Sequence, residues 1–157
     1  MWAIQRFYKI ERFCYLKKIP LVPEMIKDLI RAKYHCVIPY TAEIGENTKI
    51  AYGGIGVIMH PETKIGKNCI IGTQVTFGAN KRMDCGPTIG DNCFISTGAK
   101  ILGPITIGRG SVIGANSVVT RDMPEKSLIA GIPAKVVKSN IKVSDYSPYM
   151  KDVDDAD

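Results

Sequence analysis

The stretch PTIGDNCFISTGAKILGPITIGRGSVIGANSVVT, Pro87 to Thr120, decides the fold. Neither the 3.6-residue period of an α-helix nor the two-residue period of a strand produces its spacing. A short strand followed by a sharp corner does produce it. Three such faces, about eighteen residues in all, would complete one coil, and each coil would stack about 4.8 Å from the next. An aliphatic residue returns at every sixth position without a slip of register: Ile89, Ile95, Ile101, Ile107, Ile113 and Val119.

The same period continues toward the N-terminus, interrupted by a three-residue insertion around Tyr52 to Val57. The position after each aliphatic is mostly glycine, alanine or serine, which suits sharp corners. The fourth position after it forms a second, narrower inward slot, where Cys69 and Cys93 are expected to be small core residues rather than redox or nucleophilic groups. Periodicity alone predicts a coil but does not fix its hand. The earlier repeat positions are Ile38, Ile44, Ile50, Met59, Ile65, Ile71 and Phe77.

Three segments depart from the repeat. Residues 1–37 place apolar side chains at helical spacing among basic ones and predict two short helices, which cap the open end of the coil, pack on a neighbouring subunit or rest on anionic lipid. The stretch Ala79 to Thr88 predicts a loop, because Lys81 and Pro87 fall in narrow inward slots. The β-helix domain is expected at 38–138, and the acidic tail at 139–157 is expected to be poorly ordered.

Composition narrows the classes of function. The net charge of +6 suits anionic partners, but nucleic acid is disfavoured because aromatic residues are not interleaved with Lys and Arg on the repeat faces. Five cysteines without a CxxC pair, no secretory leader and no apolar run of about 18 residues favour a reduced, cytoplasmic protein. His35 and His60 lie outside recognised metal spacings, so no metal is expected, and His35 is interpreted as packing or helix-capping.

His60 is the first candidate for chemistry, because it occupies a corner position where most sibling repeats carry glycine, alanine or serine. We expect it beside the insertion and below Phe77-Gly78, where the loop departs, so that these irregularities form one patch. A histidine with a pKa near 6.5 is suited to general base catalysis at neutral pH; the alternative is an ordinary exposed corner histidine. The turn Tyr52-Gly53-Gly54 could supply backbone N–H groups to an oxyanion. A covalent route through Cys85 is less favoured, since no histidine adjoins it in sequence.

The block Pro87 to Val137, which closes in GIPAK at Gly131 to Lys135, resembles the hexapeptide-repeat acyltransferases, in particular their serine acetyltransferase-like branch. The resemblance runs from about Ile38 to Val137. It implies a left-handed parallel β-helix, a homotrimer and acetyl-CoA in the groove between neighbouring prisms, with the acceptor at the same interface. It also implies cofactor contacts near Gly78, Gly98, Ala99, Ala115 and Asn116, with Arg121 and Lys135 near the phosphates.

Two motifs depart from that branch. Serine acetyltransferases carry one histidine in a DHGxG-like motif and another before GVTLGG, whereas this chain has AYGGIG at Ala51 to Gly56 and GTQVTFG at Gly72 to Gly78. Tyr52 or Gly53 takes the first place and Thr73 the second. The chain looks closer to short members that O-acetylate sugars in surface polysaccharide assembly, in which a GGxGVxIH-like stretch, here Gly53 to His60, supplies the histidine.

The resulting expectation is an acetyl-CoA-dependent O-acetyltransferase for a sugar hydroxyl, with His60 as general base. Tyr52 and Asp84 are the candidate acceptor contacts. The alternatives are a serine or amino-sugar acetyltransferase, and a trimeric binding or scaffold module without catalysis. The basic residues 1–37 would suit a location at the inner face of the membrane.

Overall fold

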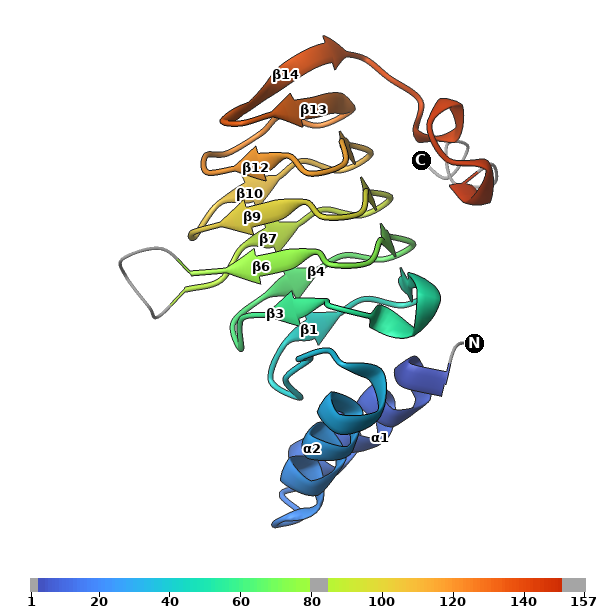
Figure 1. Cartoon of the computed structure of the whole chain (residues 1–157), viewed down its shortest axis with the longest axis vertical. Helices are drawn as coiled ribbons and strands as arrows, with labels where there is room; N and C mark the ends of the chain where they lie inside the picture. The colour runs from blue at the N-terminus through green and yellow to red at the C-terminus, as the bar shows by residue number, and fades with distance from the viewer. Residues whose placement is uncertain (1–2, 80–84, 151–157) are drawn as a thin grey trace.

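The structure is a computed structural model that describes residues 3–79 and 85–150 (Figure 1). Two helices, α1 (Ala3–Leu16) and α2 (Val22–Tyr34), form a hairpin at one end of a triangular solenoid of short strands. The first face holds β1 (Glu43–Ile44), β4 (Lys64–Ile65), β7 (Thr88–Ile89) and β10 (Thr106–Ile107). The second holds β2 (Lys49–Ile50), β5 (Ile70–Ile71), β8 (Phe94–Ile95), β11 (Val112–Ile113), β13 (Ser127–Gly131) and β14 (Ala134–Ser139). The third holds β3 (Ile58–Met59), β6 (Thr76–Gly78), β9 (Lys100–Leu102) and β12 (Val118–Val119).

Strand register records the regular coils and the two insertions. Within the described chain the strands of neighbouring coils pair in parallel, and only β13 and β14 pair antiparallel. Ile89 pairs with Ile107, eighteen residues later, as the repeat predicts. Ile44 pairs with Ile65, which includes the three-residue insertion, and Phe77 pairs with Ile101, which includes a further six residues. The predicted left-handed parallel β-helix is confirmed, and each interruption is confined to one corner of one coil.

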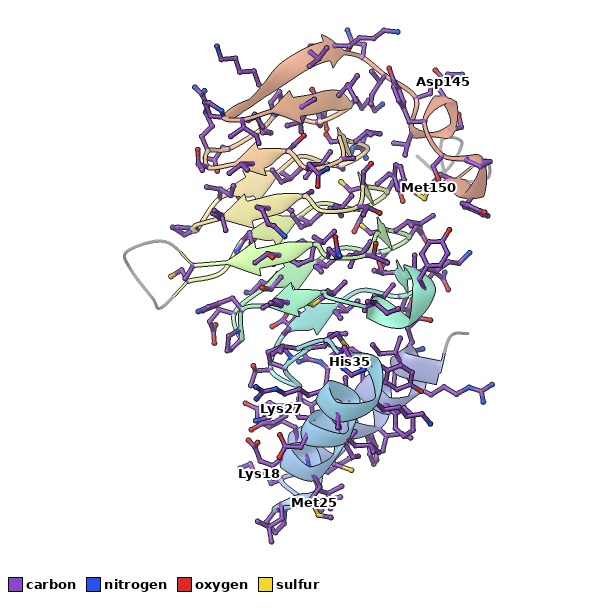
Figure 2. All side chains as sticks on the ribbon, in the orientation of Figure 1. Lys18, Met25, Lys27, His35, Asp145 and Met150 are labelled. Carbon is purple, nitrogen blue, oxygen red and sulfur yellow. The ribbon has the colours of Figure 1, made fainter. Side chains whose placement is uncertain are left out.

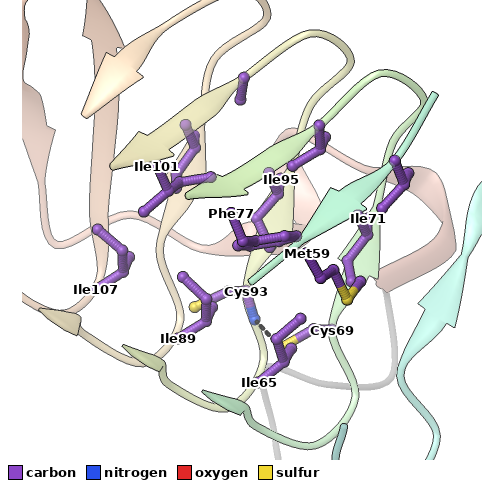
Figure 3. Close-up of a cluster of buried hydrophobic side chains, with 14 of the residues drawn as sticks. Met59, Ile65, Cys69, Ile71, Phe77, Ile89, Cys93, Ile95, Ile101 and Ile107 are labelled. Atoms are coloured by element: carbon purple, nitrogen blue, oxygen red, sulfur yellow. Dashed lines mark hydrogen bonds between the residues drawn. The ribbon is translucent and has the colours of Figure 1, made fainter. Parts of the chain in front are cut away.

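The core is the stack of inward residues, as Figure 3 shows. Ile71, Ile95 and Ile101 are fully buried, and so are Cys69 and Cys93 in the narrower slot. The backbone N–H of Cys93 lies 3.4 Å from the Cys69 sulfur, so the two thiols are stacked in adjacent coils. Their prediction as core residues is confirmed. Each fully buried aliphatic side chain contributes about 1.5–3 kcal/mol to the stability of the fold, and every added coil buries further side chains of this kind.

The loop prediction needs one adjustment at its end. β6 ends at Gly78 and β7 begins at Thr88, so the chain leaves the coil where the sequence indicated. Pro87, however, is buried in the narrow slot, and its carbonyl accepts a hydrogen bond from the Lys64 N–H at 3.0 Å. Proline lacks a backbone N–H but keeps its carbonyl, so it can occupy an inward position where no backbone donor is needed. Lys81 lies outside the described residues.

The helical hairpin caps the open end of the coil through its half nearest the first strands. The Tyr8 hydroxyl donates to the Ala42 carbonyl at 2.7 Å, and Arg12 donates to the carbonyls of Tyr40, Thr41 and Ala42. These bonds satisfy carbonyls that the next coil would otherwise pair with, because no coil lies below them. Ile4 and Ile30 join the buried core of the solenoid.

The tail differs from the expectation over 139–150. After β14, residues 143–145 and 148–150 form short 3-10 helices, η2 (Val143–Asp145) and η3 (Pro148–Met150). Ile141, Val143 and Met150 are buried against Ile70 and Val112 on the outer side of the second face. That face is unusual in carrying apolar outward residues, and their burial opposes the disorder that the acidic composition predicts. Residues 151–157 lie outside the described chain.

Candidate active site

The third face is bounded by two edges, and the candidate residues divide between them. We call the corners that precede this face the insertion edge, comprising residues 51–57, 72–75, 96–99 and 114–117. We call the corners that follow it the loop edge, comprising residues 60–63, 78–79, 85–87, 102–105 and 120–123. In Figure 1 the loop edge lies at the left of β3, β6, β9 and β12, and the insertion edge lies at the right.

His60 begins the loop edge. It follows β3 at the corner and is half-buried, with its backbone N–H donating to the Phe77 carbonyl at 2.8 Å. Its Nδ1 accepts the backbone N–H of Glu62 at 3.2 Å. An Nδ1 that accepts this bond is unprotonated, so the neutral ring carries its proton on Nε2. The basic lone pair is therefore held by a long hydrogen bond from a neighbouring corner residue, which orients the imidazole.

Gly78 lies next to His60 in the stack, as expected. The two are linked through Phe77, whose carbonyl receives the His60 N–H, and the Gly78 carbonyl in turn accepts the Gly103 N–H at 2.8 Å. A Cβ on Gly78 would lie 2.9 Å from Leu102 Cδ2, so only glycine fits without displacing that side chain. The glycine therefore leaves room for the Leu102 side chain at this corner.

Arg121 and Lys135 meet at the upper end of the loop edge. They line a depression of about 270 Å³ together with Asp122, Met123, Pro124 and Val136. Both basic side chains are exposed, while Asp122 Oδ1 accepts the Thr106 backbone N–H at 2.7 Å. Two cations beside a carboxylate that is engaged with the backbone form a suitable contact for phosphate oxygens. The sequence predicted both residues near the cofactor phosphates, and the structure brings them to one depression.

The insertion edge carries Gly98 and Asn116 in successive coils. The Gly98 N–H donates to the Thr73 carbonyl at 2.9 Å, and the Asn116 N–H donates to the Thr97 carbonyl at 3.0 Å. Gly98 has φ +77°, and a Cβ there would collide with Asn116 Oδ1. Ala115 and Asn116 are exposed at this corner. Gly98 itself is buried beneath the Asn116 side chain, so the exposed groups at this corner are Ala115 and the Asn116 amide.

The Ala99 side chain does not face the insertion edge, so it cannot make the predicted contact itself. Its side chain is fully buried in the narrow inward slot, and its carbonyl accepts the Thr76 N–H at 3.0 Å. The same repeat that places Gly98 at the corner turns the next residue into the core, because successive residues of an extended segment point to opposite sides. A ligand at the insertion edge would contact Ala115 and Asn116 and would not contact the Ala99 side chain.

Tyr52 lies on the insertion edge, across the third face from His60, so the expected single patch is wrong. The insertion forms η1 (Ala51–Gly54) and receives the helical hairpin: a Cβ on Gly54 would lie 2.8 Å from Ile4 Cδ1, and one on Gly53 would lie 3.6 Å from Tyr34. β3 separates the insertion from His60, roughly 10 Å for three extended residues. The insertion thus docks the helices, although the Tyr52 side chain is exposed. Asp84 lies outside the described residues.

Lys100 is a residue that sequence reasoning missed. It lies on the outer side of the third face between the two edges, where its Nζ donates to the Gln74 carbonyl at 2.7 Å and to Thr76 Oγ1 at 3.2 Å. The only signal in the sequence is a cation at the outward position directly before Ile101, which any solvated strand could carry. It places a positive charge between His60 and Asn116.

The remaining candidates have structural roles or lie apart. His35 ends α2 in the left-handed conformation and its N–H donates to the Arg31 carbonyl at 3.1 Å, which confirms its helix-capping interpretation. Cys85 is exposed on the loop edge. A second depression, of about 240 Å³, lies between α1 and the first coil and contains none of the candidate residues. Across residues 3–79 and 85–150, no cluster of three potential metal ligands and no helix capable of crossing a membrane is found.

Known proteins resemble both the repeat and the fold. Residues 86–121 match the family described as bacterial transferase hexapeptide (six repeats). A serine acetyltransferase of Bacillus licheniformis is 38% identical over 144 residues, which cover 90% of this chain and 64% of that protein. A structure titled as a serine acetyltransferase complex with CoA matches with a TM-score of 0.78 at 28% identity, over 85% of this chain and 55% of the other. The soybean enzyme complexed with serine matches with a TM-score of 0.80 at 29% identity, over 85% and 56%.

These comparisons correct the expected branch. The relatives named are serine acetyltransferases, so the predicted closeness to short polysaccharide O-acetyltransferases is not supported. The chain spans about two thirds or less of the length of the relatives it matches. In its repeat and its fold the chain resembles the hexapeptide-repeat transferases, and the relatives that it matches over most of its own length are serine acetyltransferases.

Proposed function

We propose that the protein is an acetyl-CoA-dependent O-acetyltransferase that works as a homotrimer. The observation that carries the proposal is the division of the candidate residues between two edges of one face. His60 and the basic pair Arg121 and Lys135 lie on the loop edge, whereas Ala115 and Asn116 are exposed on the insertion edge. In a closed threefold assembly the loop edge of one prism meets the insertion edge of the next, and the two halves form one groove.

The groove would suit acetyl-CoA along its length. The depression at Arg121 and Lys135 offers two cations for phosphate oxygens. Farther along, the exposed Ala115 and the Asn116 amide would offer a polar contact for a pantetheine chain. The acetyl group would then lie toward the lower coils, where His60 is found. The bound thioester supplies an acetyl group already activated for transfer.

His60 is the proposed general base. It removes the proton from the acceptor hydroxyl as the hydroxyl oxygen attacks the thioester carbonyl carbon. The C–S bond then breaks, and the same proton passes to the departing thiolate, so His60 returns to its neutral state. Because Nδ1 is the unprotonated nitrogen, this nitrogen takes the proton after releasing the Glu62 N–H. General base catalysis of this kind typically contributes about 10²–10⁴-fold in rate.

Serine is the first acceptor to test, since the named relatives are serine acetyltransferases and one matching structure is complexed with serine. A sugar hydroxyl is the second candidate. Thr73 and the Tyr52-Gly53 pair stand where the serine enzymes would carry histidines, and this departure favours a different acceptor.

The test is a thiol-release assay with acetyl-CoA and three acceptors in parallel: serine, a hydroxyl-bearing sugar panel and an amino sugar. Turnover with serine or a sugar, together with a threefold mass by light scattering, would support the proposal. Binding of acetyl-CoA without turnover on any acceptor would instead favour a scaffold module. A monomeric mass would remove the shared groove, and with it the role assigned to the insertion edge.

A further inference from the structure

The helical hairpin has one half that the coil covers and one half that no described segment covers. Near the coil, Tyr8 and Arg12 bind the first-coil carbonyls. At the far end, where α1 runs into α2, large apolar side chains are exposed in a group that we call the hairpin tip. Figure 2 places Lys18 and Met25 there, at the end of the molecule remote from the solenoid. The exposed fractions are 58% for Phe13, 63% for Leu16, 40% for Ile19, 76% for Leu21, 69% for Met25 and 45% for Leu29.

Two lysines border these apolar residues, and one carboxylate, Asp28, is exposed between Met25 and Leu29. Lys17 and Lys18 are exposed between Leu16 and Ile19, and the Lys17 ammonium lies 5.9 Å from the centre of the Phe13 ring. Residues 1–37 contain eight Lys and Arg against three Asp and Glu, so they hold five of the six net charges of the chain. Glu24, one of the three acids, is paired with Lys27 and receives the Tyr40 hydroxyl at 2.7 Å.

Burial reduces the acidic charge of the hairpin further. Glu11 is fully buried, and desolvation raises its pKa to about 8. At neutral pH this carboxyl is mostly protonated, so the hairpin is more positive than its formal charge indicates.

We propose that the hairpin tip is a docking surface for an anionic lipid bilayer. Leu21 and Met25 would enter the headgroup region at the end of the molecule, and Lys17 and Lys18 would contact lipid phosphates around them. A second copy of this chain fits the tip less well, because two tips facing each other would bring like charges together around the apolar residues. In the orientation of Figure 1, docking by the tip leaves the third face and both of its edges clear of the surface.

The test is co-sedimentation of the full chain with vesicles, at 50 mM and at high salt. One set of vesicles contains phosphatidylcholine and phosphatidylglycerol, and the other contains phosphatidylcholine alone. We expect binding to the anionic vesicles at low salt that falls with added salt, since exposed charges are screened. Charge reversal in K17E/K18E is expected to lower the partition coefficient at least about tenfold, because each basic residue near such a surface contributes to attraction.

The apolar contribution is tested with a matched pair of double variants. Leu21→Ser with Met25→Ser removes two exposed tip side chains and should also weaken binding about tenfold or more. Val137→Ser with Tyr149→Ser removes two side chains of similar exposure, 63% and 76%, far from the tip, and should bind as the unmodified chain does. All four positions are exposed, and a circular dichroism melt checks that each variant folds.

Two outcomes would overturn the proposal. The first is an unmodified chain that fails to sediment with anionic vesicles at low salt, or tip and control variants that bind equally. The second is a concentration-dependent doubling of mass that Leu21→Ser with Met25→Ser abolishes, in the absence of vesicle binding, which would assign the tip to a second copy. Both readouts are independent of acetyl transfer, so they do not depend on the proposed function.

Discussion

The two edges of the third face are built from the same repeat but differ in what departs from it. On the insertion edge, Gly98 and Asn116 follow the corner pattern in successive coils, with backbone hydrogen bonds at 2.9 and 3.0 Å. On the loop edge, a histidine replaces the small corner residue, and six additional residues separate β6 from β7. Above its three-residue insertion, the insertion edge repeats one backbone geometry from coil to coil, whereas the loop edge carries the group suited to proton transfer. The predictions below separate these two contributions.

The largest effect is expected at His60. We predict that His60→Ala lowers kcat about 10²–10⁴-fold, because it removes the proposed base, while the Kd for acetyl-CoA changes by less than about twofold. Steady-state thiol release and calorimetric titration with CoA measure the two quantities. His35→Asn is the matched control, because asparagine tolerates the left-handed φ of 53° that His35 adopts. Equal turnover in both variants would exclude His60 from the mechanism.

The second prediction concerns the core residues of the third face, which lie between the two edges. Ile101 of β9 is fully buried between them, and Ile101→Ala should lower the free energy of unfolding by about 2–5 kcal/mol. Ile58 lies on the outer side of the same face and is 48% exposed, so Ile58→Ala should cost about 0.5 kcal/mol or less. Urea denaturation distinguishes the two. Similar losses in both variants would contradict the assignment of inward and outward positions.

The third prediction concerns the insertion edge alone. Gly98→Ala introduces a Cβ at φ +77° that collides with Asn116, so it should cost about 1–2 kcal/mol of stability and weaken CoA binding as well. Gly110 has φ +64°, but its nearest contact is the flexible Lys126 side chain at 3.4 Å, at a corner away from the third face. Gly110→Ala should therefore destabilise through backbone strain and leave the Kd for CoA unchanged. Thermal melts and titrations measure both, and a loss of CoA affinity in both variants would point to general distortion.

The smallest effect is expected at the basic pair. Arg121→Ala and Lys135→Ala should each raise the Kd for CoA by about three- to tenfold. An exposed charge pair contributes about 1 kcal/mol to the binding free energy, and a charge-assisted hydrogen bond to phosphate contributes somewhat more. The dependence of Kd on salt should become shallower in each variant. Arg109→Ala is the control, since its guanidinium lies 3.3 Å from Glu125 at another corner. An unchanged salt dependence would remove these cations from the phosphate site.

The repeat made the fold predictable, because six-residue periodicity fixes which residues point inward and where each corner falls. Cys69, Cys93 and His35 were interpreted correctly for the same reason: their roles follow from local position. The position of Tyr52 relative to His60 was not predicted correctly, because it depends on which face the intervening residues occupy. Ala99 was placed at the cofactor although the repeat itself turns it inward. The burial of Met150 could not be predicted either, since it requires the apolar outer row of the second face, which only the stacked coils assemble.

We propose that each site takes His60 from one protomer and the exposed Asn116 corner from the next. The most direct test mixes two variants, His60→Ala and Asn116→Trp, during coexpression or refolding, and measures acetyl transfer. If neighbouring chains share each site, random trimers should regain about one quarter of the activity of the unmodified chain, because one site in four then combines an intact half from each variant. A mixture that remains as inactive as its components would show that the groove is not shared and would contradict the account.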